Sequence, residues 1–257
     1  MAQVDPLTLE TLPALSSPRT LLIAFSGWSD AGSAATNAVQ YVAAQMSAEK
    51  FASIDGEEFV DFTVQRPLVR LDEQQIRQLD WPGWQFSAAR NLVFATGPEP
   101  HLKWRTFCDL VERLLEQVQI ERVALLGAFL AEVLYTDPVP LTGFSSDPSL
   151  LERLRVSPTA YQGPTGIVGA LADRVRRRSL PLLSLWAAIP HYIAGTPNPR
   201  GALALLLRLR EWTELPIDLA PLESAAATFQ SQLLEAVEGN AELSKYIRNL
   251  KKGETSH

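Results

Sequence analysis

The sequence predicts an α/β fold: a three-layer α/β/α sandwich with a mostly parallel central sheet, followed by C-terminal helices. Two observations predict this class. Short continuous apolar runs, which suit strands buried on both faces of a parallel sheet, alternate with segments whose apolar residues recur at helical spacing. The chain also has 257 residues, which is enough for one large core without a second domain. Alternation of this kind favours a sheet covered by helices on both faces.

Four segments are expected to form buried strands. The first, 20–25 (TLLIAF), is followed by a turn that contains glycine and by a helical segment, which together form the first half of a βαβ unit. The other three are 91–97 (NLVFATG), 122–130 (RVALLGAFL) and 180–190 (LPLLSLWAAIP). A further strand with one polar face is expected at 57–64 (EEFVDFTV), because its apolar residues alternate.

Apolar residues at helical spacing predict helices within 29–46, 103–119, 147–155, 163–179 and 200–212. A loop rich in Pro, Thr, Gly and Ser is expected over 136–147, and long loops inside compact domains tend to be functional. The last part of the chain has the pattern of two helices broken at Gly239. We therefore expect a single α/β domain at 1–220 and a C-terminal helical extension at 221–257 packed on the same core.

Charge and composition exclude several classes of function. A net charge of -6 and a pI near 5.2 argue against nucleic acid as a partner, because that affinity comes mainly from Lys and Arg on phosphates. No stretch approaches the roughly twenty apolar residues of a membrane span, and the first residues lack the positive charge of a signal peptide. We expect a cytoplasmic protein with no membrane partner. Cys108, the only cysteine, is expected to be buried in a helix.

The candidate catalytic residues lie in loops that follow the predicted strands. In an open α/β sheet, ligands bind at the carboxyl ends of the strands. Asp30, Glu99, His101 and His191 are the acid–base candidates in these loops. Asp30 either caps the first helix or faces the same crevice as Glu99 and His101. The two histidines are either general bases or loop residues paired with backbone carbonyls.

Other residues of these loops are candidates for ligand binding. Trp28 and Tyr192 are large amphipathic side chains, which suit a protein interface, a ligand pocket or the edge of the core. Thr165 and Gly166 precede a helix whose free amides can hold an anion. The predicted ligand-binding residues are Gly27, Trp28, Asp30, Thr136, Thr165, Gly166 and Tyr192.

No complete catalytic or cofactor motif is present. The segment 27–33 has two glycines separated by four residues, but it lacks the lysine that a phosphate loop needs, and it has no GxGxxG pattern. The sequence has no GxSxG nucleophile elbow, and its three histidines lack the spacing of a zinc helix. We expect no cofactor and no metal.

Five ordered motifs carry a family resemblance: GWSDAGS at 27–33, GPEPHLKW at 97–104, AEVLYTDPVPLTG at 131–143, YQGPTGI at 161–167 and PHYIAGTPNP at 190–199. Their order and spacing resemble the proteasome assembly chaperone 2 family, in its bacterial branch. The resemblance implies an α/β/α fold similar to that of phosphorylases and peptidyl hydrolases. It also implies a homo-oligomer, with trimers frequent among bacterial relatives.

The chain departs from the family pattern in two places. The family usually has His and Arg around the threonine of the third motif, where this chain has Tyr135 and Asp137 around Thr136. A carboxylate in place of a basic residue disfavours an anion there. Relatives that act on proteasome rings can end in a hydrophobic-Tyr-any tail, whereas this chain ends Glu-Thr-Ser-His, so we do not expect docking by that route.

Two functions remain open from the sequence. The first is a homo-oligomeric, non-catalytic binding or assembly protein that presents its strand-end loops to an unknown protein or small-molecule partner. The alternative is a small-molecule hydrolase or group-transfer enzyme with an acid–base site at the carboxyl ends of the strands.

Overall fold

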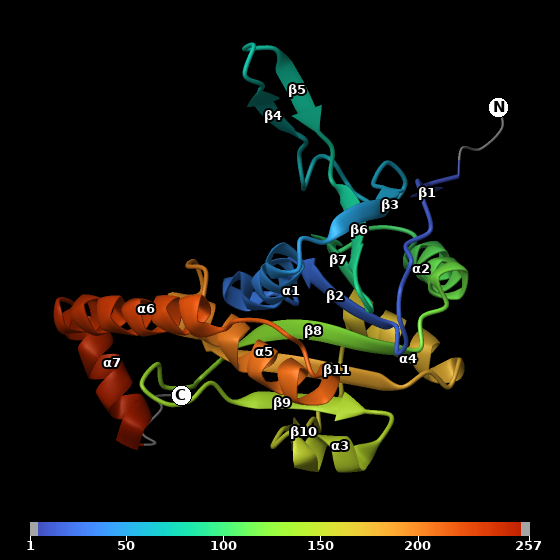
Figure 1. Cartoon of the computed structure of the whole chain (residues 1–257). Helices are drawn as coiled ribbons and strands as arrows, with labels where there is room; N and C mark the ends of the chain where they lie inside the picture. Colours follow the sequence, from blue (N-terminus) through green and yellow to red (C-terminus); the bar gives the residue numbers. More distant parts are fainter. Residues whose placement is uncertain (1–4, 253–257) are drawn as a thin grey trace.

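Four parallel strands form the middle of a nine-stranded sheet in the computed structural model, which describes residues 5–252 (Figure 1). In sheet order they are β7 (Leu92–Pro98), β2 (Thr20–Ser26), β8 (Arg122–Ala131) and β11 (Leu182–Pro190). Antiparallel β6 (Gly83–Ala89), β3 (Glu49–Asp55) and β1 (Leu7–Leu9) extend one side. On the other side, β9 (Leu141–Ser145) is antiparallel to β11, and β10 (Ser157–Pro158) is parallel to β9.

Helices cover both faces of this sheet, so the predicted α/β/α layering is confirmed. Alternate residues of β2 enter two separate buried clusters: Leu21 and Ile23 enter one, Leu22 and Ala24 the other. The first cluster is completed by α2 (Trp104–Val118) and α4 (Ile167–Arg177). The second is completed by α1 (Ala34–Gln45), α3 (Pro148–Arg153) and α5 (Pro199–Thr213).

An aromatic cluster supports the α2 side of the sheet. The ring of Phe107, on α2, lies 4.5 Å from Trp84, 5.7 Å from Phe59 and 5.9 Å from Phe25, measured between ring centroids. All four side chains are fully buried. The backbone carbonyl of Phe59 also accepts hydrogen bonds from the amides of His101 and Leu102. The cluster therefore holds the loop after β7 in place.

The segment 57–64 is not a strand, which corrects the sequence-based prediction. The amides of Phe59 and Val60 donate to the carbonyl of Gly56, which forms a turn. The Asp61 carboxylate then accepts from the amide and hydroxyl of Thr63, at 2.8 and 2.6 Å. Local side-chain hydrogen bonds of this kind compete with sheet pairing, and they outweigh the alternating pattern here.

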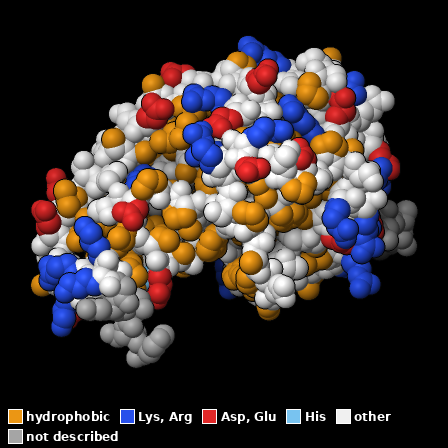
Figure 2. All heavy atoms as spheres, turned by 90° about the horizontal axis from the view of Figure 1, so that it is seen from below, with side chains coloured by type: hydrophobic (Ala, Val, Ile, Leu, Met, Phe, Trp, Pro, Cys, Tyr) orange, Lys and Arg blue, Asp and Glu red, His pale blue; other side chains and the backbone are white. Residues whose placement is uncertain are grey.

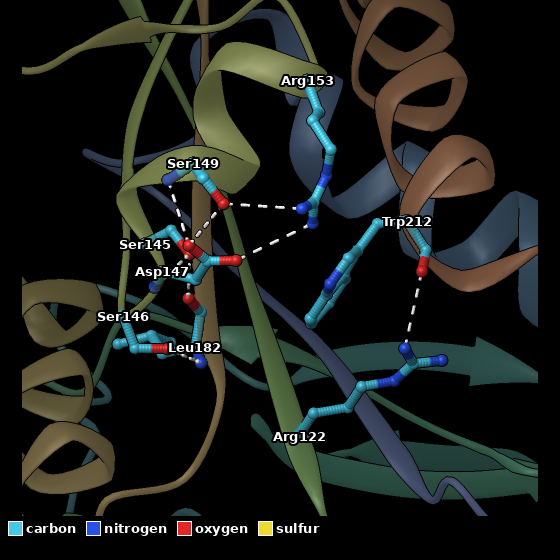
Figure 3. A network of polar contacts seen from close by, with 8 residues as sticks. All are labelled: Arg122, Ser145, Ser146, Asp147, Ser149, Arg153, Leu182 and Trp212. Atoms are coloured by element: carbon cyan, nitrogen blue, oxygen red, sulfur yellow. Dashed lines mark hydrogen bonds and ion pairs between the residues drawn. The ribbon is translucent and has the colours of Figure 1, made fainter.

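The expected loop at 136–147 contains a strand, β9, which the sequence-based analysis did not identify. The side chains of two serines join the end of this strand to the start of β11 by hydrogen bonds (Figure 3). Ser145 Oγ donates to the carbonyl of Leu182 at 3.0 Å, and Ser146 Oγ accepts from the Leu182 amide at 2.9 Å. Asp147 then accepts from the Ser149 amide and caps α3, the helix predicted within 147–155.

Two parts of the chain stand away from the sheet in Figure 1. A separate antiparallel hairpin of β4 (Leu68–Leu71) and β5 (Arg77–Asp80) projects beside β6; we call residues 64–81 the arm. At the other end of the chain, α6 (Ala220–Glu238) packs on α5, and α7 (Ala241–Lys252) follows it. These are the two helices predicted around Gly239. Within residues 5–252 no helix is both long and apolar enough to cross a membrane.

Cys108 should not react in the folded protein. Its side chain is 2% exposed on α2, and burial raises the pKa of the thiol to about 12, so very little reactive thiolate forms at pH 8. We expect a disulfide reagent such as DTNB to leave the native chain unlabelled and to label it completely in guanidinium chloride. Stoichiometric labelling of the native chain would contradict this burial.

Candidate functional site

The carboxyl ends of the four parallel strands meet at one edge of the sheet, which we call the rim. Hydrogen bonds join the loops that begin there. The amide of Asn198, after β11, donates to the carbonyl of Gly32, after β2, at 2.7 Å. The amide of Tyr135, after β8, donates to the hydroxyl of Tyr192, after β11, at 2.8 Å. The amide of Ile167, at the start of α4, donates to Glu99, after β7, at 2.8 Å.

One open cleft of about 680 Å³ lies at the β2 and β7 end of the rim. Its lining includes five residues of the predicted loops: Gly27, Trp28, Glu99, His101 and Trp104. Val64 and Gln65, at the base of the arm, complete its wall. The cleft thus combines two indole rings, a carboxylate and an imidazole. Trp28 is 65% exposed, which makes it the largest uncovered apolar side chain of the cleft.

Glu99 is the anion at the start of α4. Its Oε1 accepts from the amide of Ile167, and a negative charge at a helix amino end is stabilised by the helix dipole. A Cβ at Gly166 would lie 2.4 Å from the same oxygen, so a larger residue there would displace the Glu99 carboxylate. A carboxylate of the chain itself therefore accepts from an amide at this helix start, where the sequence indicated that free amides after Thr165 and Gly166 can hold an anion.

Asp30 caps α1, which is one of the two roles that the sequence left open. It is 7% exposed, and its carboxylate accepts from the amides of Ala35 and Thr36, at 2.8 and 3.2 Å, and from the Thr36 hydroxyl. Burial raises the pKa of this carboxyl because the charged form loses its hydration, although the three hydrogen bonds oppose the shift. Both oxygens are used within the protein.

The two candidate histidines are paired with backbone groups in different ways. Nδ1 of His101, an exposed residue, accepts from the amide of Asp61 at 3.1 Å. Nδ1 of His191 lies 3.2 Å from the carbonyl of Ala131, so the tautomer with a proton on Nδ1 fits this contact. His191 thus has the carbonyl partner that the sequence suggested, whereas His101 has an amide partner.

A second group of rim residues joins the C-terminal helices to the sheet. The ring of His191 packs edge-on against Tyr192 and against Tyr246 of α7, at 5.4 and 5.5 Å. The Tyr192 hydroxyl donates to the carbonyl of Val133 at 3.1 Å, and burial raises the pKa of this phenol. This group is a packed joint between β11, the loop after β8 and α7.

An arginine from α5 contacts the loop in which Tyr135 and Asp137 replace the residues that the family usually has. The guanidinium of Arg200, on α5, donates to the carbonyls of Tyr135 and Asp137. Tyr135 is 4% exposed, and the hydroxyl of Thr136 donates to the Asp137 carboxylate at 3.1 Å. A positive charge therefore does lie on this loop, and it binds the loop backbone.

The four catalytic candidates are thus distributed over three local groups. Glu99 and His101 line the cleft, Asp30 lies at the start of α1, and His191 lies in the joint with α7. In residues 5–252 no hydrogen bond links any two of these four, and no group of three His, Cys, Asp or Glu residues is placed to hold a metal. Their catalytic and ligand-binding roles stay predictions.

Sequence reasoning missed three residues that contact the rim loops. The amide of Asp61 contacts His101, 40 positions away, and the side chains of Arg200 and Tyr246 contact Tyr135 and His191, 65 and 55 positions away. No local pattern marks such partners, because their contacts arise only when distant elements pack.

Comparison with known proteins identifies the family. The sequence profile of the PAC2 family matches residues 24–237. The chain belongs to the PAC2 family. A PAC2 family protein from Streptomyces avermitilis is 37% identical, with a TM-score of 0.81 over 89% of this chain and 99% of that one. A proteasome-assembly chaperone homologue from Mycobacterium tuberculosis is 34% identical, with a TM-score of 0.80 over the same shares of the two chains.

More distant structures share the fold alone. PbaB from Pyrococcus furiosus, an archaeal proteasome activator, is 14% identical, with a TM-score of 0.70 over 90% of this chain and 98% of that one. No curated protein matches the sequence. The family and fold predicted from the five motifs are therefore confirmed for this PAC2 family protein.

Asp30→Asn should change how stability depends on pH. Because the folded pKa of Asp30 is raised above 3.8, its contribution to the free energy of unfolding is fully present below the unfolded pKa and is lost as the pH rises through the folded pKa. Asparagine does not titrate. In urea unfolding, the free energy of the wild type minus that of the variant should therefore fall as the pH rises from acid towards neutral.

Asp61→Asn is the matched control for this experiment. Hydrogen bonds from Thr63 lower the pKa of Asp61, so its contribution is present above the unfolded pKa and is lost as the pH falls. The corresponding difference should rise with pH. A rising difference for Asp30→Asn as well would show that Asp30 is not desolvated as described.

Proposed function

We propose that this PAC2 family protein is a homo-oligomeric, non-catalytic assembly protein that binds a protein partner at the rim. The contrast between charged and apolar side chains carries the proposal. Asp30, Glu99 and His191 are held by backbone groups of the protein. Four large apolar or aromatic residues of the rim are exposed instead: Trp28, Leu102, Leu130 and Tyr161 are 65%, 53%, 48% and 63% exposed.

Such side chains suit a protein partner. Aromatic residues are enriched in protein interfaces, and a few of them in a central pocket supply most of the binding free energy. Here Trp28 and Glu99 both line the cleft. The ring of Trp28 also lies close to the start of α4, since one of its carbons is 3.5 Å from the position that a Cβ at Gly166 would occupy. An apolar partner side chain would find Trp28 and Trp104 on the walls of one cleft.

The similar proteins suggest the kind of partner. One is a proteasome-assembly chaperone homologue and another an archaeal proteasome activator. By analogy, we propose proteasome subunits, in the cytoplasm, as the partner of this chain. The C-terminal tail, Glu-Thr-Ser-His, lies outside the described residues, and the proposal does not use it. The net charge of -6 supports a protein rather than a nucleic acid.

Self-association is part of the proposal. The resemblance to bacterial family members favours a trimer. Each copy would consist of the α/β domain of residues 1–220, with residues 221–257 packed on the same core. Two contacts support this packing: Leu222 of α6 belongs to the same buried cluster as α5, and Tyr246 of α7 packs on His191.

Trp28→Asp should weaken binding to proteasome subunits without unfolding the chain. Loss of a central aromatic contact typically costs 2 kcal/mol or more, which is about a thirtyfold rise in the dissociation constant. Leu234→Asp, at a 46% exposed residue of α6 that does not line the cleft, adds the same charge and should bind like the wild type. Binding of purified α subunits to immobilised full-length protein measures both. Equal affinity of Trp28→Asp and the wild type would refute the rim as the binding surface.

The alternative is a small-molecule enzyme, because Glu99 and His101 line one cleft. A ligand at one hundred times its dissociation constant stabilises the native state by about 2.7 kcal/mol, which thermal unfolding detects. We expect no such shift with nucleotides, nucleosides, phosphorylated sugars, short peptides or divalent metals. A shift of that size that His101→Ala abolishes would favour the enzyme over the assembly protein.

A further inference from the structure

A second cleft, of about 630 Å³, lies between the arm and the sheet. Its floor is formed by β6 and β7. Gln85 of β6 and Thr96 of β7 are directly opposed in the antiparallel ladder, so their side chains point to the same face of the sheet. Leu92 and Phe94 share this face of β7 and are buried in the cluster with α1, whereas Thr96 is half-buried and lines the cleft.

Two other elements form the walls of this cleft. On α1, Thr36 and Gln40 are four residues apart, so they line the cleft from the same face of the helix. On the arm, the residues that line it include Gln65, Leu79 and Trp81. Side chains from α1, the arm, β6 and β7 therefore border one space, and its volume lies within the roughly 300–1,000 Å³ that is typical of small-molecule sites.

The lining is rich in uncharged hydrogen-bonding groups. Within residues 5–252, four of its side chains have no hydrogen-bond partner in the protein: those of Gln40, Gln65, Gln85 and Thr96. Each carboxamide offers two N–H donors and an acceptor oxygen, and a hydroxyl also both donates and accepts. The cleft thus presents donors and acceptors together, and it does so from four different elements.

The cleft carries no net charge. Among the residues that the structure describes, Arg70 and Asp80 are the only charged ones in the lining, and they form an ion pair with each other. The face opposite the arm is different in character, since Figure 2 shows basic and acidic side chains there among hydrophobic ones. An anion in the cleft would compete with Asp80 for Arg70, and a cation would compete with Arg70 for Asp80. This balance favours a neutral ligand.

The arrangement of the polar groups narrows the class of neutral ligand. An apolar molecule would leave the carboxamides unpaired after it displaced water from them, which costs free energy. The base of a nucleoside has its polar groups along the edge of one plane, whereas the hydroxyls of a sugar ring point in several directions. Trp81, which is 56% exposed, adds an aromatic ring against which the apolar face of a sugar ring packs. Donors and acceptors on several sides of one aromatic ring suit a sugar.

We propose that this cleft binds a neutral mono- or disaccharide, whose hydroxyls pair with Gln40, Gln65 and Gln85 and whose ring packs on Trp81. The inference goes beyond the proposed function, because binding a protein partner at the rim does not require a small ligand. The two clefts adjoin, since Ser26 and Gln65 line both of them. The sugar therefore lies next to the site proposed for the protein partner, under the base of the arm.

Ligand-observed NMR with defined sugars tests the binding. The probes are glucose, galactose, mannose, maltose, lactose and trehalose, each added to the full-length protein. We expect at least one of them to receive saturation from the protein in a saturation-transfer difference spectrum. Calorimetry with that sugar should then give a dissociation constant of about 1 mM or lower, with one sugar per chain. No binding by any of these sugars would overturn the proposal.

Gln40→Ala/Gln85→Ala tests the location. The double variant removes carboxamides from two sides of the cleft, and the loss of two hydrogen bonds should raise the dissociation constant of the sugar about tenfold or more. Gln45→Ala/Gln74→Ala changes exposed positions of α1 and the arm outside the lining, so it is the matched control and should stay within about twofold. Equal affinity of Gln40→Ala/Gln85→Ala and the wild type would rule out this cleft as the site.

Thr96→Val is a second variant that keeps the shape of the side chain and removes its hydroxyl. It should raise the dissociation constant about threefold, because one hydrogen bond is lost. Thermal unfolding of each variant shows whether the chain is folded. If Thr96→Val and Gln40→Ala/Gln85→Ala both fold and both bind the sugar like the wild type, the proposed contacts are wrong.

Two further ligands test the chemistry of the cleft. Glucose 6-phosphate should bind more weakly than the best of the neutral sugars, because the guanidinium of Arg70 is already paired with Asp80. Adenosine should also bind more weakly, because its base presents polar groups on one edge. Tighter binding of either ligand than of every neutral sugar would contradict the assignment to a neutral sugar.

The sugar site and the proposed assembly function can fail separately. Gln40, Gln85 and Thr96 do not line the cleft of Trp28, so their variants should bind proteasome subunits like the wild type. Absence of sugar binding would overturn the sugar site and leave the binding of subunits in place. Unchanged subunit binding by Trp28→Asp would overturn the rim as a protein-binding surface and leave the sugar site in place.

Discussion

The parallel register of four central strands is the constraint on which the rest of the structure depends. β8 and β11 pair along nine residues, from Val123 with Leu182 to Ala131 with Pro190, and β2 pairs in parallel with both β7 and β8. Because parallel strands all end at the same edge, this ladder brings together loops that are far apart in the chain, such as those of Gly32 and Asn198, whose backbones share a hydrogen bond. Neither the cleft nor the joint with α7 would form without it.

Two carboxylates at that edge accept hydrogen bonds from the amides of helix starts. Asp30 accepts from two amides at the start of α1, and Glu99 accepts from the Ile167 amide at the start of α4. A helix start leaves several amides without partners, so an acidic residue there has a structural role before it has any chemical one. The hydrogen bonds of Asp30 and Glu99 therefore account for acidic residues at these strand ends without any chemical role, and the exposed aromatic residues carry the functional proposal.

The arm and the C-terminal helices show how the fold divides its surfaces. α7 attaches to the rim through Tyr246, so a helix distant in sequence contributes to the same edge as β11. The arm contacts the body at its base, where the ring of Trp81 lies 5.0 Å from that of Phe62, and the side chains of Val69 and Leu71 are exposed. The sheet thus supports two elements of different kinds, one that packs on the rim and one that projects from the body (Figure 1).

The layered α/β fold, the central strands, the helix within 147–155 and the family were predicted from the sequence alone. These follow from periodicity, capping residues and motif order, all of which act locally. The sequence did not determine that 57–64 forms a turn, that Arg200 binds the loop around Thr136, or that Glu99 fills the amino end of α4. The turn depends on local hydrogen bonds that compete with the alternating pattern. The other two contacts join residues that are 65 and 68 positions apart, so they form only when distant elements pack together.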